Sequence, residues 1–190
     1  MEKTLVQTGN DTSRLFKIIL YGPESTGKTT LSADLAKHYK TAWVPEYMRS
    51  YLEEKWEQHQ TPISKEDLIP IAKGQLAWEE KIASQVDKLL ICDTNLLELK
   101  VYSKYYYDGF VPDFILNNIS KSDKEIYLLT NIDVPWEPDG MRDRPFDREK
   151  MFEMFENELK QNGFQYHIMK GNREERLQKA IKIIDKLIDI

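Results

Sequence analysis

The chain has 190 residues, of which 41% are hydrophobic and 31% are charged, a balance typical of a single soluble globular domain. A net charge of −5 disfavours a large binding surface for nucleic acid or for an anionic membrane. No apolar stretch approaches the roughly 20 residues that span a bilayer. We therefore expect a small-molecule partner, with neither nucleic acid nor membrane as a partner.

The only cysteine, Cys92, closes the apolar run from Leu89, so we expect a buried thiol. Without a second cysteine there is no disulfide within the chain, which fits a reducing, cytoplasmic compartment. Residues 1–14 are polar and contain no apolar core, which predicts a tail and not a signal peptide. Residues 15–190 are expected to form one domain.

Strand-like and helix-like patterns alternate along the chain. The first expected strand, Phe16–Tyr21, is a short apolar run that ends at Gly22, and Lys28–Tyr39 has helical spacing. The pattern then predicts, in order, a strand at Thr41–Val44, a helix from a capping box at Ser64 to about Gln85, a strand at Lys88–Asp93, a helix at Asn95–Tyr107, a strand at Glu125–Thr130, a loop at Asn131–Asp147, a helix at Arg148–Gln161, a strand at Gln165–Met169 and a helix at Glu174–Asp189.

Strands separated by helices predict an α/β fold with a parallel sheet covered on both faces. Ligands of such sheets bind beyond the carboxyl ends of the strands. Polar clusters follow Tyr21, Val44 and Cys92, which are the last or nearly last residues of three expected strands. The sequence therefore predicts one site at this edge of the sheet.

The cluster after Tyr21 fits the phosphate-loop pattern G-x-x-x-x-G-K-[ST] without a mismatch. Its glycines let successive backbone N–H groups point at phosphate oxygens, and the helix start adds further donors. We expect Lys28 to contact the β- and γ-phosphates and the Thr29 hydroxyl to bind Mg²⁺. The alternative is an ordinary glycine-containing turn. The predicted ATP contacts are Gly22, Pro23, Glu24, Ser25, Thr26, Gly27, Lys28, Thr29 and Thr30.

Two carboxylates follow neighbouring strands. Asp93 stands where a phosphate-loop protein places an acid beside Mg²⁺. Glu46 follows Pro45 and could accept the proton of an attacking hydroxyl, or it could simply cap the next helix. The sequence does not decide whether Glu46 or Asp93 is the general base. Arg49 could pair with Glu46 or reach a phosphate.

The loop from Asp133 to Arg144 carries two arginines, Arg142 and Arg144. A closing loop that delivers a guanidinium would stabilise the charge of a transferring phosphoryl group and exclude water. Arg142 is the preferred candidate because Gly140 lies beside it, and Arg144 is a candidate for nucleotide contact. The alternative is a surface loop whose arginines pair with its own acids.

Aromatic and amide side chains are candidates for substrate recognition. Tyr47 and Trp136 flank the expected site, and an aromatic face would attract a pyridinium cation by about 0.5–2 kcal/mol. Trp43 is expected to be core. The amide of Gln75 could pair with a carboxamide or a base edge, or it could be a solvated helix residue.

Four blocks of the chain together resemble the ribosylnicotinamide kinase domain of NadR-type proteins. They are Gly22–Leu31, Trp43–Tyr47 with Arg49, Asp93–Asn95, and Asp133–Trp136 with Asp139, Gly140 and Arg142. The resemblance implies a P-loop NTPase fold close to deoxynucleoside and thymidylate kinases, with a five-stranded parallel sheet and a lid. It also implies transfer of the ATP γ-phosphate to the 5′-hydroxyl of nicotinamide riboside.

The same resemblance places Asn95 with the substrate, and Asn172 and Arg173 near the adenine. NadR-type proteins usually carry an adenylyltransferase domain with a His-x-Gly-His motif, whereas His38, His59 and His167 stand in no such motif. We therefore expect phosphorylation without adenylylation. The alternatives are a deoxynucleoside or nucleotide kinase and a non-catalytic ATP-binding regulatory module.

Overall fold

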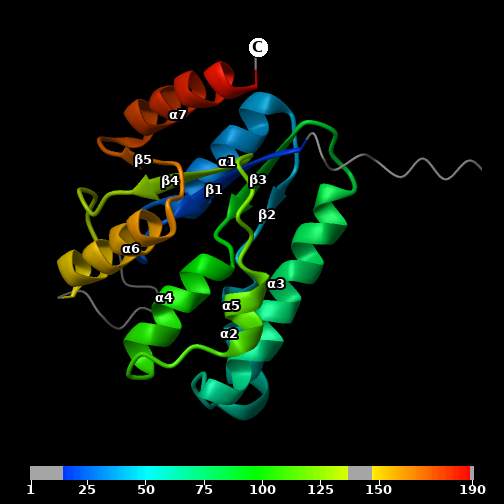
Figure 1. The fold of residues 1–190 in the computed structure, drawn as a ribbon, viewed down its shortest axis with the longest axis vertical. Coiled ribbons are helices and arrows are strands. Elements are labelled where there is room, and N and C mark those ends of the chain that lie inside the picture. The colour runs from blue at the N-terminus through cyan, green and yellow to red at the C-terminus, as the bar shows by residue number, and fades with distance from the viewer. Residues whose placement is uncertain (1–14, 137–146, 189–190) are drawn as a thin grey trace, which may run out of the picture.

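The protein folds around a five-stranded sheet whose strands run in the order β2-β3-β1-β4-β5. The computed structural model describes residues 15–136 and 147–188 (Figure 1). All four pairs of neighbouring strands are parallel. The strands are β1 (Phe16–Tyr21), β2 (Trp43–Val44), β3 (Leu89–Asp93), β4 (Glu125–Thr130) and β5 (Tyr166–Met169).

Helices connect the strands and cover both faces of the sheet. They are α1 (Lys28–Tyr39), α2 (Tyr47–His59), the 3-10 helix η2 (Lys65–Asp67), α3 (Leu68–Ala83), α4 (Leu96–Tyr106), α5 (Asp113–Asn118), α6 (Arg148–Asn162) and α7 (Arg173–Leu187). Figure 1 shows α1 and α7 on one side of the sheet, with α3, α4 and α6 on the other. No helix in the described ranges has the length and apolarity needed to cross a membrane.

Alternate side chains of β1 enter two separate cores, as the period of a strand requires. Ile18 and Leu20 pack with apolar residues of α1 and α7. Ile19 and Tyr21 pack with residues of α4 and α6 on the opposite face. The strands are apolar on both faces because both faces are covered, so β1, β3 and β4 appear in the sequence as continuous apolar runs.

The α/β class, the parallel sheet and all five expected strands are confirmed, with small differences at the ends. β2 begins at Trp43, two residues later than expected, and Trp43 is partly buried against the sheet. The capping box at Ser64 is present, but it opens η2, and α3 follows. The Cys92 thiol is buried as expected, and burial raises its pKa.

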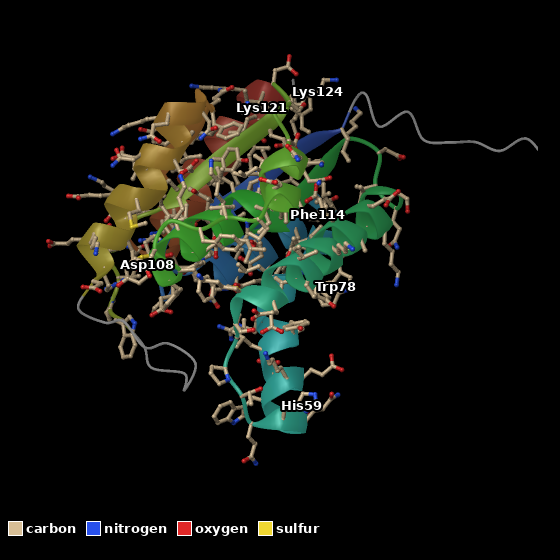
Figure 2. All side chains as sticks on the ribbon, turned by 60° about the horizontal axis from the view of Figure 1, so that its bottom comes forward. His59, Trp78, Asp108, Phe114, Lys121 and Lys124 are labelled. Carbon is tan, nitrogen blue, oxygen red and sulfur yellow. The ribbon has the colours of Figure 1, made fainter. Side chains whose placement is uncertain are left out.

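The hydrophobic pattern did not predict the bounds of α2 or the existence of α5. None of the α2 residues is fully buried, so this helix has no continuous apolar stripe in its sequence. Figure 2 shows His59 at the end of α2, where the helix extends beyond the sheet. α5 is only six residues long, too short for a periodic signal.

The start of α2 is held by α3. Gln75 accepts a hydrogen bond through Oε1 from the backbone N–H of Tyr47 at 2.8 Å. The Tyr47 ring lies over Gly74 and meets Trp78 edge-on, with centroids 4.9 Å apart. Gln75 is 4% exposed, so the interpretation as a solvated helix residue is wrong. These contacts fix the residue before Tyr47, Glu46, relative to the sheet.

Gly74→Ala should destabilise the protein, although alanine is the better helix former. The new methyl group would overlap the Tyr47 ring, and we expect the free energy of unfolding to fall by about 1–3 kcal/mol in urea denaturation. In a Tyr47→Ala background the overlap is removed, and the same substitution should be neutral or stabilising by up to about 1 kcal/mol. A stabilising effect with Tyr47 in place would contradict this packing.

Candidate active site

The phosphate loop leaves β1 over the end of β4, and this close passage requires glycine. Gly22 has φ of 141°, and a Cβ there would lie 2.7 Å from the Thr130 hydroxyl and 2.9 Å from its carbonyl oxygen. Gly27 has φ of 82° and precedes the first residue of α1. Two positions of the sequence motif are therefore explained by backbone geometry.

Side chains distant in sequence hold the loop from behind. Arg176 of α7 is 4% exposed and donates hydrogen bonds to the carbonyl oxygens of Thr26, Gly171 and Asn131, and it pairs with Asp133. Arg148 of α6 donates to the carbonyls of Ser25, at 3.3 Å, and Val134, at 2.9 Å. Neither arginine stands in a motif, so the sequence did not indicate that either belongs to the site.

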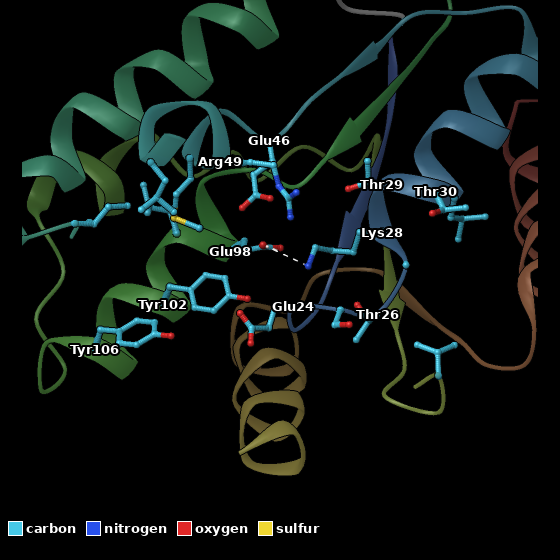
Figure 3. A pocket seen from close by; sticks show the side chains of 18 of the residues that line it. Glu24, Thr26, Lys28, Thr29, Thr30, Glu46, Arg49, Glu98, Tyr102 and Tyr106 are labelled. Carbon is cyan, nitrogen blue, oxygen red and sulfur yellow. Dashed lines mark ion pairs between the residues drawn. The ribbon is translucent and has the colours of Figure 1, made fainter. Parts of the chain in front are cut away.

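Lys28 lies at the centre of the site. Its ammonium donates to the carbonyl oxygens of Gly22 at 2.7 Å and Pro23 at 2.9 Å, and it lies 3.6 Å from Glu98 Oε1 (Figure 3). The residue as a whole is 8% exposed. The positive charge that a phosphate would meet is thus held against the loop by these contacts.

Thr29 and Asp93 meet as the sequence predicts for a metal site. The Thr29 hydroxyl donates to Asp93 Oδ2 at 2.6 Å, while Asp93 Oδ1 is buried without a hydrogen-bond partner among the described residues. Burial raises the pKa of Asp93, and the Thr29 hydrogen bond and the charges of Lys28 and Arg49 oppose that rise.

These oxygen donors fit a hard divalent cation such as Mg²⁺, which prefers one or two carboxylate ligands with water and phosphate. The described parts of the chain contain no group of three or more histidine, cysteine or acidic side chains placed to hold a metal by themselves. Further ligands of such a cation would have to come from a nucleotide and from water.

Glu46 and Arg49 stand at the start of α2. Glu46 precedes the helix in an extended conformation, but its side chain makes no capping hydrogen bond. Glu46 is thus the N-cap residue of α2, the position that the alternative predicts, without a side-chain hydrogen bond to the helix. Both side chains line the same cavity as Lys28 and Thr29. The cluster after Val44 and the cluster after Tyr21 thus meet, as the arrangement of the strands predicts.

Glu98, on the first turn of α4, is an acidic group of the site that sequence reasoning missed. It is 2% exposed, and its Oε2 has no hydrogen-bond partner among the described residues. Burial raises its pKa well above the usual range; Lys28 opposes this, and Glu46 and Asp93 add to it. The available signal was a single acid inside the apolar stretch from Leu96 to Leu99.

One cavity of about 760 Å³ connects these groups. The phosphate loop closes one end, Glu46 and Glu98 lie in the middle, and helices α2 and α4 form the far walls. Figure 3 shows Tyr102 and Tyr106 following Glu98 along α4, away from Lys28. The apolar and aromatic lining of the far end consists of Met48, Leu52, Ile63, Leu68, Leu99, Tyr102, Tyr106 and Tyr107.

Gln75 and Asn95 lie beside a second, small cavity of about 20 Å³, which also touches Glu46 and Glu98. Gln75 Nε2 is buried without a partner among the described residues. The Asn95 side chain caps α4 by accepting from Leu97 N–H at 3.0 Å, and it donates to the Tyr127 hydroxyl at 2.9 Å. Both residues therefore line the small cavity and not the large one.

The other candidates are distributed around the site. Thr30 and Arg173 line the large cavity, and Arg173 also forms a bidentate pair with Asp34. Asn172 caps α7. Tyr47 and Trp136 are not among the residues lining the cavity, and Trp136 follows Val134 and Pro135, which are. Arg142 and Arg144 of the expected lid, with Asp139 and Gly140, lie outside the described residues.

The resemblance inferred from the sequence blocks is confirmed by comparison with known proteins. The chain is similar to the trifunctional NAD biosynthesis/regulator protein NadR of Salmonella typhimurium strain LT2, with 22% identity over 174 residues that cover 90% of this chain and 42% of NadR. The chain thus spans less than half the length of that relative.

Solved structures share the fold. A crystal structure of NadR in complex with NR superposes with a TM-score of 0.77 at 19% identity, over 93% of this chain and 52% of that one. Deoxyadenosine kinase from M. mycoides, with products dCMP and a flexible dCDP bound, gives a TM-score of 0.68 at 18% identity over 90% and 99% of the two chains.

A family profile described as AAA domain matches residues 17–176. The matched segment includes the phosphate loop, Glu46, Asp93 and Glu98, and it ends at Arg176, which holds the loop. With most of its length inside this match and with the phosphate-loop fold described above, the chain belongs to the AAA domain family.

Proposed function

We propose that this protein is a Mg²⁺- and ATP-dependent kinase that phosphorylates the 5′-hydroxyl of a nucleoside, with nicotinamide riboside as the preferred acceptor. The observation that carries the proposal is the single cavity in which Lys28 faces Glu46 and Glu98 and beyond them an apolar, aromatic space. The similarity to NadR, crystallised with NR, supports this choice of acceptor.

In the donor half, the loop N–H groups and Lys28 hold the triphosphate. The Lys28 ammonium exchanges the carbonyls of Gly22 and Pro23 for β- and γ-phosphate oxygens, which offer full negative charge. Thr29 and Asp93 would hold Mg²⁺, which when bound neutralises charge on the phosphate oxygens.

In the acceptor half, Glu46 is the general base. Asp93 already accepts a hydrogen bond from Thr29 and is assigned to the metal. Of the glutamates that line the cavity, Glu24 belongs to the phosphate loop and Glu98 lies 3.6 Å from the Lys28 ammonium, so Glu46 is assigned to the acceptor hydroxyl. Glu46 takes the hydroxyl proton as the acceptor oxygen bonds to the γ-phosphorus, while the bond from that phosphorus to the β-phosphate oxygen breaks and ADP leaves.

The charges of the acceptor half favour a nucleoside over a nucleotide. A nucleotide would bring its own phosphate close to Glu46, and like charges at short range are costly. Arg49 is the arginine that the described residues contribute to this half. A pyridinium cation suits the same surroundings, because the rings of Tyr102 and Tyr106 line the cavity and Glu46 offers negative charge.

An acceptor screen tests the proposal. The full chain is incubated with ATP, Mg²⁺ and, separately, nicotinamide riboside, deoxyadenosine, thymidine and thymidylate, and both ADP and the phosphorylated product are measured. We expect the highest kcat/KM for nicotinamide riboside. If the riboside is phosphorylated no faster than ATP is hydrolysed without an acceptor, the protein is not a riboside kinase. If thymidylate is phosphorylated faster than the riboside, the protein is a nucleotide kinase.

Lys28→Met should lower kcat for the preferred acceptor by about 100-fold or more, because the charge on the transferring phosphate loses its ammonium partner. Lys37→Met, an exposed change on the same helix, is the control and should behave as the wild type. Thermal denaturation checks that both variants fold. Retained turnover in a folded Lys28→Met protein would contradict the role given to Lys28.

Glu46→Gln should lower kcat by about 10²–10⁴-fold and leave the KM for ATP nearly unchanged, because the amide accepts no proton. Glu57→Gln, an exposed change further along α2, should have no effect. Initial rates at saturating ATP and acceptor provide the measurement. If the loss appears in the KM for ATP instead of kcat, Glu46 is not the base.

A further inference from the structure

The contact with Lys28 explains only one of the two carboxyl oxygens of Glu98. Its Oε1 lies 3.6 Å from the Lys28 ammonium, but its Oε2 is buried, faces no donor among the described residues, and belongs to a group that lines the large cavity. A buried carboxyl oxygen without a donor is costly to keep. A ligand that brings a hydroxyl group to this point would remove that cost.

The position of Glu98 indicates which part of a ligand it meets. Lys28 contacts the phosphate that is transferred, so a carboxyl 3.6 Å from its ammonium lies beside the transfer point. The part of an acceptor nearest that point is the sugar that carries the receiving hydroxyl. Tyr102 and Tyr106 follow one and two helical turns later, about 6 and 12 Å along α4, which is the length of a sugar followed by a base.

We propose that Glu98 is an acceptor-binding residue whose carboxyl group accepts a hydrogen bond from a ring hydroxyl of the acceptor's ribose. This inference rests on the proposed kinase function and adds the group that recognises the sugar. Glu46 then remains available for the 5′-hydroxyl. The base extends along α4 toward Tyr102 and Tyr106.

The chain contains a matched control for a purely structural role. Glu125, at the start of β4, is 4% exposed, lies 3.6 Å from the Lys17 ammonium, and has a buried Oε2 without a partner among the described residues. Burial raises the pKa of Glu125, as it does for Glu98. Glu125 does not line the large cavity, because β4 begins at the opposite edge of the sheet.

The experiment compares Glu98→Met with Glu125→Met, which keep the length of the side chain and remove its hydrogen-bonding oxygens. Kinetics are measured with the preferred riboside and with its 2′-deoxy and 3′-deoxy analogues. We expect Glu98→Met to lower kcat/KM for the riboside by about 10- to 100-fold, mainly through KM, with the KM for ATP unchanged. Glu125→Met should leave all these constants unchanged.

The deoxy analogues identify the hydrogen bond itself. For the wild type, removal of the contacted hydroxyl should lower kcat/KM about as much as Glu98→Met lowers it for the riboside. The Glu98→Met variant should then have about the same kcat/KM for that analogue as for the riboside. Additive losses for both analogues, a change confined to the KM for ATP, or equal effects in the Glu125 control would overturn the inference. Wild-type protein that phosphorylates no nucleoside would remove the proposed function as well, so the two failures are distinguishable.

Thermal denaturation is recorded for each variant. Should Glu98→Met lack a cooperative transition, Glu98→Gln takes its place, since it preserves the shape and one of the two oxygens. The same pattern is then expected with a smaller loss, and additivity would again overturn the inference.

Discussion

The site depends on the position of one ammonium group. The Lys28 ammonium is held by two backbone carbonyls of its own loop, and it lies 3.6 Å from the carboxyl of Glu98 on α4, which covers the opposite face of the sheet from α1. This arrangement places a positive charge between a phosphate-binding surface and a cavity lined by carboxyl groups. In the proposed reaction, a donor phosphate and an acceptor hydroxyl would meet beside Lys28.

The loop can position Lys28 because its own carbonyls are held by side chains. Arg176 and Arg148 come from α7 and α6, which pack on opposite faces of the sheet, and both donate to carbonyl oxygens of the loop. These hydrogen bonds fix the carbonyls of Ser25 and Thr26, so helices on both faces of the sheet hold the loop in shape. A loop that is held in one conformation loses less conformational entropy when it binds phosphate.

The free-energy cost of burying ionisable groups at the centre of the protein is offset by apolar cores that do not include those groups. Asp93, Glu98 and Lys28 are nearly inaccessible to solvent, and burial raises the pKa of both acids. Two apolar layers on either side of the sheet supply the burial that stabilises the fold. A cluster of this kind is more readily explained by chemistry than by stability.

The sequence alone determined the features that depend on neighbours along the chain. Apolar runs predicted the five strands, helical spacing predicted α1, α3, α4, α6 and α7, and the glycines of the phosphate loop predicted a turn that favours glycine. Tertiary structure decided the rest. Whether Gln75 is buried, which face of α4 lines the cavity, and that Arg148, Arg176 and Glu98 belong to the site depend on contacts between residues far apart in sequence. Such contacts leave no periodic trace in the sequence, because a side chain's chemistry is set locally while its surroundings are set by packing.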